Sequence, residues 1–258
     1  MAQYSDDFID RLHLIWGLGF LSPGGPEEVA EIVHGLDLHG ALVLDIGCGT
    51  GGPATVLARD MGAHLICIDV EPHLLDRARA LTVEACVQDR IDFKLFEPGA
   101  FPFEADTFDV VFSKDALIQI PDKQSLYVDI LRILKPGGAF AASDWLSGEN
   151  ASDDEAFQQY LSLAHLDFTM ATATATAEIM KKAGFDRVET TDRNAWYAAL
   201  SALEVHEIEG PLRDQIIAVC DAKTYNNWLA VRRALANAVK SGGLRPTHLR
   251  GYRPMSIG

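Results

Sequence analysis

Short runs of apolar residues alternate along the chain with longer stretches in which apolar positions recur every three or four residues. Continuous apolar runs are typical of strands covered on both faces, and the longer spacing is typical of amphipathic helices. The runs predict strands at residues 41–46, 64–69, 91–96, 107–113 and 137–144. Further strands are expected at residues 186–191 and 244–252.

Residues at the ends of the predicted helices support the assignment. Asp122 is placed to cap one helix, and Pro136-Gly137-Gly138 to end it. Thr176 is placed to cap another helix, after an alanine–threonine linker at 171–177. Alternating strands and helices are typical of a parallel sheet with helices on both faces. The predicted helices cover residues 4–17, 26–36, 53–61, 72–87, 123–134, 153–168, 176–182 and 194–240, the last interrupted at Gly210-Pro211.

We therefore predict an α/β fold: a Rossmann-like, doubly wound, mostly parallel seven-stranded sheet whose last strand is antiparallel. The chain of 258 residues suits one elaborated domain. Residues 41–145 form its predicted cofactor-binding core, and residues 146–258 supply substrate-side helices and the C-terminal strands. Residues 1–40 are predicted to be helical, and they either close over a bound ligand as a lid or cap the sheet.

The formal net charge of −15 narrows the range of partners. Nucleic-acid phosphates and anionic membranes need basic surfaces, whereas the chain has 22 Lys and Arg against 37 Asp and Glu. No apolar run reaches the roughly 18 residues of a membrane-spanning helix, and the first residues are too polar and acidic for a signal peptide. The four cysteines and eight histidines show no metal spacing. These features predict a cytoplasmic protein without a metal, a nucleic-acid partner or membrane insertion. We expect a monomer or a homodimer.

The most informative stretch is the glycine-rich turn after the first predicted strand. Gly47, Gly49 and Gly52 satisfy the spacing G-x-G-x-x-G, and Gly51 lies in the same turn. Glycine permits positive φ, and the N-terminus of the following helix presents free N–H groups to a ligand. The spacing alone is a weak signal, because a tight strand-to-helix turn that binds nothing can also satisfy it.

Two acidic residues at strand ends sharpen this prediction. Asp45 precedes the first glycine by two positions, where a carboxylate repels a pyrophosphate but can bind a cationic amino-acid group. Asp69 ends the next strand, where an acid is placed to accept hydrogen bonds from ribose hydroxyls. Three further strand ends carry Phe96-Glu97, Ser113-Lys114-Asp115 and Ser143-Asp144-Trp145.

The motif at Asp45 and the acidic strand end resemble the signature of class I S-adenosylmethionine (SAM) methyltransferases. A more particular resemblance, to the phosphoethanolamine N-methyltransferases, covers about residues 4–145 well and the rest loosely. Five features carry it in one order: Tyr4, Ser22-Pro23-Gly24-Gly25, the motif at Asp45, Ser113-Lys114-Asp115-Ala116 and Ser143-Asp144-Trp145.

The resemblance implies SAM as the cofactor and a set of site residues. An aromatic surround suits the SAM sulfonium and any methylated onium product. The expected catalytic positions are Tyr4 and Gln119. The expected cofactor-binding residues are Tyr4, Ser22, Asp45, Gly47, Gly49, Gly51, Asp69, Val70, Phe96, Glu97, Ser113 and Lys114. The expected acceptor-binding residues are Trp16, Phe20, Asp115, Trp145, His165, Arg232 and Arg250.

The sequence departs from this family where the chemistry lies. The family pairs its N-terminal tyrosine with a histidine after the fourth strand, and Gln119 stands in the place of that histidine. The family holds phosphate with an Arg, a Tyr and a C-terminal Lys, and the corresponding positions fall near Ala164, Leu166 and Val231. Arg232 and Arg233 are adjacent to the last of these positions. We therefore expect methyl transfer to a small-molecule amine that is not a phospho-base.

Three hypotheses other than methyl transfer to an amine remain open. An amine acceptor with a pKa of about 10 must lose a proton before transfer, and Gln119 cannot act as a base. A small thiol or thioether needs less help with deprotonation than an amine does, so S-methylation is the second hypothesis. A nicotinamide-dependent oxidoreductase is disfavoured by Asp45, and a non-catalytic methyltransferase-like subunit is disfavoured by the intact cofactor motif.

Overall fold

The computed structural model describes residues 4–165 and 170–255. The chain divides into two compact units, each assembled from segments that are distant in sequence. Unit 1 comprises Met1–Gly17, Trp145–Ala173 and Thr191–Thr247. Unit 2 comprises Leu18–Asp144, Thr174–Thr190 and His248–Gly258.

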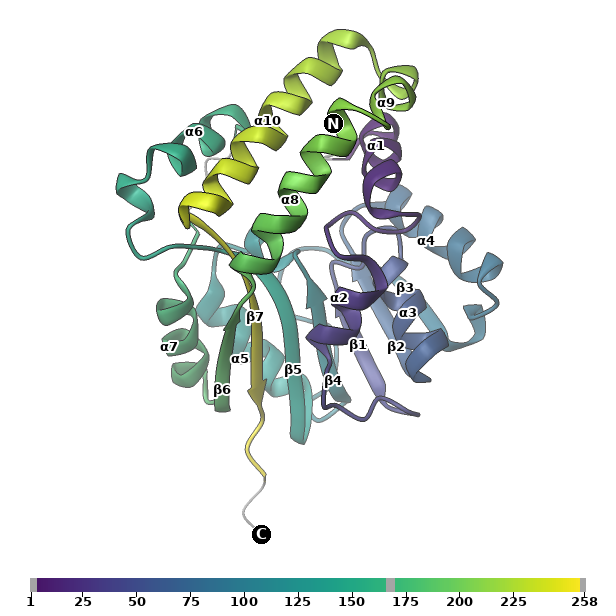
Figure 1. Ribbon diagram of the computed structural model, residues 1–258. Coiled ribbons are helices and arrows are strands. Elements are labelled where there is room, and N and C mark those ends of the chain that lie inside the picture. The colour runs from purple at the N-terminus through teal and green to yellow at the C-terminus, as the bar shows by residue number, and fades with distance from the viewer. Residues whose placement is uncertain (1–3, 166–169, 256–258) are drawn as a thin grey trace. The chain divides into compact units, whose positions relative to one another are not determined.

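Seven strands form one sheet that is mostly parallel, with one antiparallel strand, and helices flank it (Figure 1). This confirms the predicted Rossmann-like α/β fold. The strands are β1 (Leu42–Ile46), β2 (His64–Asp69), β3 (Ile91–Leu95), β4 (Phe108–Lys114), β5 (Leu134–Ser147), β6 (Asp186–Asp192) and β7 (Leu244–Tyr252).

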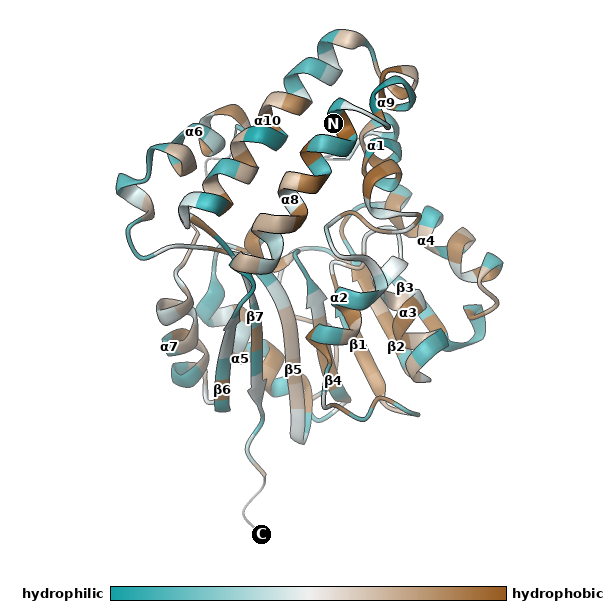
Figure 2. Cartoon of the chain, in the orientation of Figure 1, coloured by the Kyte–Doolittle hydropathy of each residue, from teal (hydrophilic) through white to brown (hydrophobic). Residues whose placement is uncertain are grey.

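In the strand order β3-β2-β1-β4-β5-β7-β6, the direction in which successive strands are added to the sheet reverses between β1 and β4. From β1 the chain adds β2 and β3 on one side, and from β4 it adds β5 on the other. Ligands bind at such switch points, at the carboxyl ends of the strands. Both neighbours of β1 are parallel to it, so the three strands end at one edge. Figure 2 shows β1 and β2 as predominantly hydrophobic, consistent with central strands that form the core.

Unit 2 contains the central part of the sheet and the helices that cover it. In Figure 1, α2 (Gly25–Ile32) lies on the near face of the sheet and α5 (Lys123–Ile133) on the far face. Asp122 caps α5 as predicted, because its side chain accepts a hydrogen bond from the Ser125 N–H. The other helices of this unit are α3 (Gly52–Met61), α4 (Pro72–Glu84), α7 (Ala173–Ala183) and the short η1 (Gln88–Arg90) and η2 (Leu117–Gln119).

Unit 1 is built around a long helix, α10 (Ala222–Ser241), which packs against both α6 (Glu155–Leu163) and α8 (Asn194–Glu209). The first helix, α1 (Asp6–Trp16), contacts α8 and α9 (Arg213–Val219) (Figure 1). A further short helix, η3 (Ala151–Asp153), precedes α6. The predicted break near Gly210 is confirmed, and a second break follows α9, where Asp221 caps α10 by accepting from the Thr224 N–H.

Two predicted boundaries are wrong. Pro136-Gly137-Gly138 does not end α5, because α5 already ends at Ile133 and the tripeptide lies inside β5. There it forms an irregularity in the pairing with β4: Leu134 pairs with Phe108, and the next pair is Ala139 with Val110. Proline lacks an N–H and Gly137 has a φ of +79°, so both suit a bulge.

The alanine–threonine stretch at 171–177 is largely helical rather than a linker. Helix α7 begins at Ala173, so Thr176 lies inside it, buried, and does not cap it. Alanine is the strongest helix former, which explains why the helix starts early. The predicted end of the helix at 153–168 falls at residues 166–168, outside the described residues; the described helix α6 ends at Leu163. In the described part of the chain, none of the helices combines the length and the apolar character needed to cross a membrane.

Candidate functional site

The glycine-rich turn joins β1 to α3 at the switch point of the sheet. Gly47, Gly49 and Gly51 have φ values of +72°, +53° and +84°. A Cβ atom on Gly47 would stand 2.3 Å from the Cβ of Ala116, which follows β4, and one on Gly51 would stand 2.9 Å from the Cβ of Ala78 in α4. The turn therefore needs glycine both for its conformation and for its close approach to two neighbouring elements.

Replacing Gly47 with alanine is expected to destabilise the protein by about 1–3 kcal/mol more than Gly35→Ala, the cost of an overpacked contact. Gly35 has a φ of +80°, but a Cβ atom on it meets nothing within 4 Å. The conformational cost is therefore similar in both variants, and the difference isolates the contact with Ala116. Urea unfolding measures both; equal losses of free energy would show that the turn is not tightly held.

Residues 18–24, which precede α2, pack directly on this turn within unit 2. The Gly19 carbonyl accepts a hydrogen bond of 2.9 Å from the Gly52 N–H. Leu21 lies against Gly49, since a Cβ atom on that glycine would stand 3.0 Å from Leu21 Cδ1. Phe20, a predicted acceptor-binding residue, is buried beside Gly52.

Asp45 is the most unusual residue near the turn. Its side chain is buried, and its Oδ2 atom has no hydrogen-bond partner within residues 4–165 and 170–255. Burial, and to a smaller extent the charge of Asp69, raises the pKa of Asp45 to about 8. A buried carboxylate needs a partner, and a cation or a hydrogen-bond donor would supply one. The geometry thus leaves one oxygen open for a cationic ligand group.

Asp69 ends β2 and holds the turn in place. Its Oδ2 atom accepts a hydrogen bond of 2.9 Å from the Gly49 N–H, and its Oδ1 atom accepts one of 3.0 Å from the Glu71 N–H. Burial raises the pKa of Asp69, and the backbone hydrogen bonds oppose this rise. A carboxylate has about four acceptor positions, so both oxygens can still accept hydrogen bonds from a ligand.

The other predicted cofactor residues of the β2 and β3 ends are more exposed. Val70 follows Asp69 and is 49% exposed. Phe96 is half-buried; its N–H donates to the Asp69 carbonyl at 2.9 Å, and its ring lies 5.5 Å from that of Phe101. Glu97 is exposed. Phe96 is therefore tied to the same strand edge as the two acids, at a position suited to a flat ligand ring.

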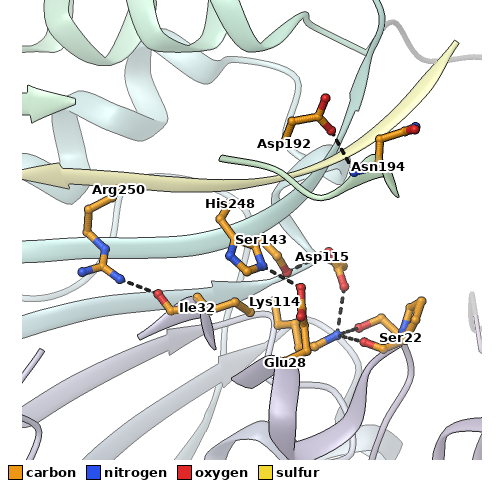
Figure 3. A network of polar contacts seen from close by, with 11 residues as sticks. Ser22, Glu28, Ile32, Lys114, Asp115, Ser143, Asp192, Asn194, His248 and Arg250 are labelled. Atoms are coloured by element: carbon orange, nitrogen blue, oxygen red, sulfur yellow. Dashed lines mark hydrogen bonds and ion pairs between the residues drawn. The ribbon is translucent and has the colours of Figure 1, made fainter. Parts of the chain in front are cut away.

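Lys114 and Ser22, both predicted to bind the cofactor, form a hydrogen bond with each other (Figure 3). The Lys114 Nζ atom donates to Ser22 Oγ at 2.6 Å, to the Pro23 carbonyl at 2.7 Å and to Asp115 Oδ2 at 3.0 Å. Ser143 Oγ in turn donates to Asp115 Oδ1 at 2.8 Å. The lysine side chain is 3% exposed, so its ammonium group serves mainly to fasten the Ser22 turn to the end of β4.

Ser113 and Gln119 take different places around the same strand end. Ser113 is buried, and its Oγ atom donates to the Ile46 carbonyl at 2.8 Å, which ties β4 to β1. Gln119 is exposed at the end of η2. Asp144, which we did not predict as a site residue, positions η2 by accepting from the Ile118 N–H at 2.9 Å. The position of Asp144 in the Ser143-Asp144-Trp145 motif is the sequence feature that could have identified it as a site residue.

Three of the predicted acceptor-binding residues meet in one cluster of unit 1. The Trp16 indole donates to Glu204 Oε1 at 2.7 Å, and Arg232 forms an ion pair with Glu204 Oε2. The Arg232 guanidinium lies 5.1 Å from the centre of the Trp16 ring and donates to the Tyr197 hydroxyl at 3.1 Å. The ring of Trp145 lies 5.1 Å from that of Tyr197. Trp16, Trp145 and Arg232 were predicted as separate candidates, and Glu204 and Tyr197, which join them, were not among the predicted site residues.

The remaining predicted residues lie elsewhere. Tyr4, half-buried ahead of α1 in unit 1, has its ring 5.8 Å from that of Phe8. His165 is exposed after α6, with a φ of +53°. Arg250 in unit 2 donates to the Ile32 carbonyl at 2.5 Å, at the end of α2 (Figure 3). Arg250 therefore anchors α2. Leu166, one of the positions aligned with the phosphate-binding set, lies outside the described residues.

The described residues hold no group of three or more His, Cys, Asp or Glu side chains arranged to bind a metal ion.

Helix α10 carries a buried cation, the guanidinium of Arg232. Burial opposes the charge of Arg232, but Tyr197 and Glu204 outweigh it and raise the pKa of the guanidinium. The guanidinium is thus charged at any physiological pH.

Known proteins resemble the chain over most of its length. Phosphoethanolamine N-methyltransferase 1 of Zea mays is 30% identical over 210 residues, which are 81% of this chain and 41% of that protein. A sterol 24-C-methyltransferase of Neurospora crassa is 31% identical over 165 residues, which are 60% of this chain and 44% of that protein. The chain spans less than half the length of the curated relatives it matches.

Structural similarity extends over nearly the whole chain. Phosphoethanolamine N-methyltransferase 2 of Haemonchus contortus, solved with phosphomonomethylethanolamine and S-adenosylhomocysteine, superposes with a TM-score of 0.89 and 25% identity, covering 98% of this chain and 58% of that one. A family model described as a methyltransferase domain matches residues 38–200. The chain therefore belongs to the methyltransferase domain family.

Proposed function

We propose that this protein is a SAM-dependent methyltransferase that acts on a small molecule. The unpartnered oxygen of Asp45 beside the glycine-rich turn carries the proposal. The α-ammonium group of SAM would supply the cation that this buried carboxylate lacks. A dinucleotide would instead bring its pyrophosphate to the turn beside Asp45, where a carboxylate repels it. The arrangement therefore favours SAM over a nicotinamide cofactor.

The residues around the turn fit the rest of SAM. Asp69 suits its ribose hydroxyls. Phe96 is placed to flank the adenine ring. SAM supplies a methyl group activated by a sulfonium, so the protein's task is to align the acceptor and exclude water.

The acceptor that we propose is a small-molecule amine without a phosphate group, with a thiol or thioether as the alternative. Two of the positions aligned with the phosphate-binding residues of the phosphoethanolamine enzymes fall near Ala164 and Val231, which carry no charge, although Arg232 and Arg233 adjoin Val231. The curated relatives have names with chemically different acceptors, a phospho-base and a sterol, so their names do not determine this one. The net charge of −15 supports a small molecule over nucleic acid.

Calorimetry with SAM tests the cofactor, and a methyl-transfer screen tests the acceptor. The screen offers labelled SAM with small amines, amino acids, phospho-bases, thiols and thioethers, and a parallel assay follows nicotinamide absorbance. We expect SAM binding and label transfer to an unphosphorylated compound. Absence of SAM binding would support a non-catalytic subunit, and a change in nicotinamide absorbance would support an oxidoreductase.

Asp69→Ala is expected to weaken SAM binding by about 1.5–3 kcal/mol, the scale of a hydrogen bond to a charged group. The change removes the proposed ribose acceptor and the hydrogen bond that Asp69 accepts from the Gly49 N–H, so both effects act in the same direction. Asp76→Ala is the matched control, because Asp76 is 77% exposed on α4. Calorimetry compares the two; unchanged SAM affinity in Asp69→Ala would remove Asp69 from the site.

A further inference from the structure

Helices α8 and α10 are joined by two Glu–Arg pairs in different surroundings. Glu204 and Arg232 have side chains that are 4% and 8% exposed. Glu209 and Arg233 form a second pair of 2.6 Å with side chains that are 38% and 57% exposed. The two pairs have the same chemistry on the same two helices, so the exposed pair serves as an internal reference for the buried one.

Glu204 is the centre of the buried cluster. Its two oxygens accept from the Trp16 indole, the Tyr197 hydroxyl and the Arg232 guanidinium. One N–H of the guanidinium is unsatisfied: Arg232 Nε is buried and has no acceptor in the part of the chain that the structure describes. Trp16 and Trp145 are half-buried, so the aromatic part of the cluster keeps some accessible surface.

The charge of Glu204 changes what this cluster can bind. Arg232, the Trp16 indole and the Tyr197 hydroxyl are all hydrogen-bond donors, and without the glutamate they would make a cationic receptor for phosphate. With the glutamate, the group has no net charge. A dianionic phosphate would then have to displace Glu204 from Arg232 or lie beside it, and either arrangement is unfavourable in a poorly hydrated site.

We propose that Glu204 is the acceptor-specificity residue of this protein: it neutralises Arg232 and thereby excludes phosphorylated amines while admitting unphosphorylated ones. The inference rests on the proposed methyltransferase function. It assigns the exclusion of phosphate to one carboxylate, in addition to the uncharged residues at the positions aligned with the phosphate-binding set.

Glu204→Gln, tested against Glu209→Gln, separates this role from a structural one. Glutamine keeps the shape and an acceptor for Trp16 but removes the negative charge. Calorimetry of the protein loaded with S-adenosylhomocysteine measures Kd for phosphoethanolamine and for ethanolamine. We expect the ratio of the two affinities to shift toward phosphoethanolamine by about tenfold or more in Glu204→Gln and by less than about twofold in Glu209→Gln. Adding Arg232→Gln to Glu204→Gln should reverse the gain.

A folded Glu204→Gln protein that binds S-adenosylhomocysteine but gains no affinity for phosphoethanolamine overturns the proposal. The wild-type protein provides a second measurement that does not depend on a variant folding: tighter binding of phosphoethanolamine than of ethanolamine also overturns it. Loss of the proposed function has a different signature, because the wild-type protein would then fail to bind S-adenosylhomocysteine at all.

Discussion

Asp45→Asn is expected to stabilise the ligand-free protein at pH 8 and, at the same time, to remove most of its affinity for SAM. The pKa of Asp45 is raised from 3.8 to about 8, chiefly by burial. The folded protein therefore binds a proton that the unfolded chain releases, and this contribution to stability is complete below about pH 4. It is lost as the pH rises toward 8, at about 1.4 kcal/mol for each unit of pKa shift. Asparagine has no charge to bury, so the variant escapes that loss.

Urea unfolding at pH 5 and pH 8 measures the stability effect. The free energy of unfolding of Asp45→Asn relative to wild type should increase over this interval by an amount on the order of several kcal/mol. SAM affinity should fall by about tenfold or more, because a charge-assisted hydrogen bond is lost. Asp60→Asn is the control, since Asp60 is 45% exposed and pairs with Arg59. Parallel pH curves for Asp45→Asn and wild type would contradict the burial argument.

The cofactor side of the molecule could be predicted from sequence because its determinants are local. Gly47 and Asp45 are close in sequence to a strand end, and parallel strands bring their carboxyl ends to one edge without further information. Lys114 shows the limit of this reasoning. Its contact with Ser22 spans 92 residues, and no local pattern indicates that the turn would occupy its ammonium group.

The cluster in unit 1 could be predicted only in part. Aromatic residues and an arginine are evident candidates for an acceptor site, so Trp16 and Arg232 were found. Glu204 was missed because a glutamate in a helix is normally exposed, and its burial depends on Trp16, which is 188 residues away. The bulge at Gly137 was missed for a related reason: it follows from pairing with β4, whereas glycine and proline after a helix ordinarily end it.

Arg232→Met is expected to destabilise the protein by about 3–5 kcal/mol, the usual cost of leaving one member of a buried ion pair alone. The change leaves the Glu204 carboxylate buried with hydrogen bonds from Trp16 and Tyr197 but without its counter-ion. Converting Glu204 to glutamine in the same protein should recover about 2 kcal/mol or more, because the uncompensated charge is then gone. Urea unfolding of the single and double variants measures both effects.

Arg233→Met is the matched control, with an expected change within about 0.5 kcal/mol, because Arg233 is 57% exposed. If the double variant were as unstable as Arg232→Met, lost packing and hydrogen bonds rather than charge would explain the loss. Recovery would have a functional meaning as well. A buried ion pair is seldom the most stable choice for a protein interior, since apolar side chains of similar size often serve as well or better. If Glu204 determines specificity, the pair is explained by the net charge that it gives the cluster and not by its contribution to stability.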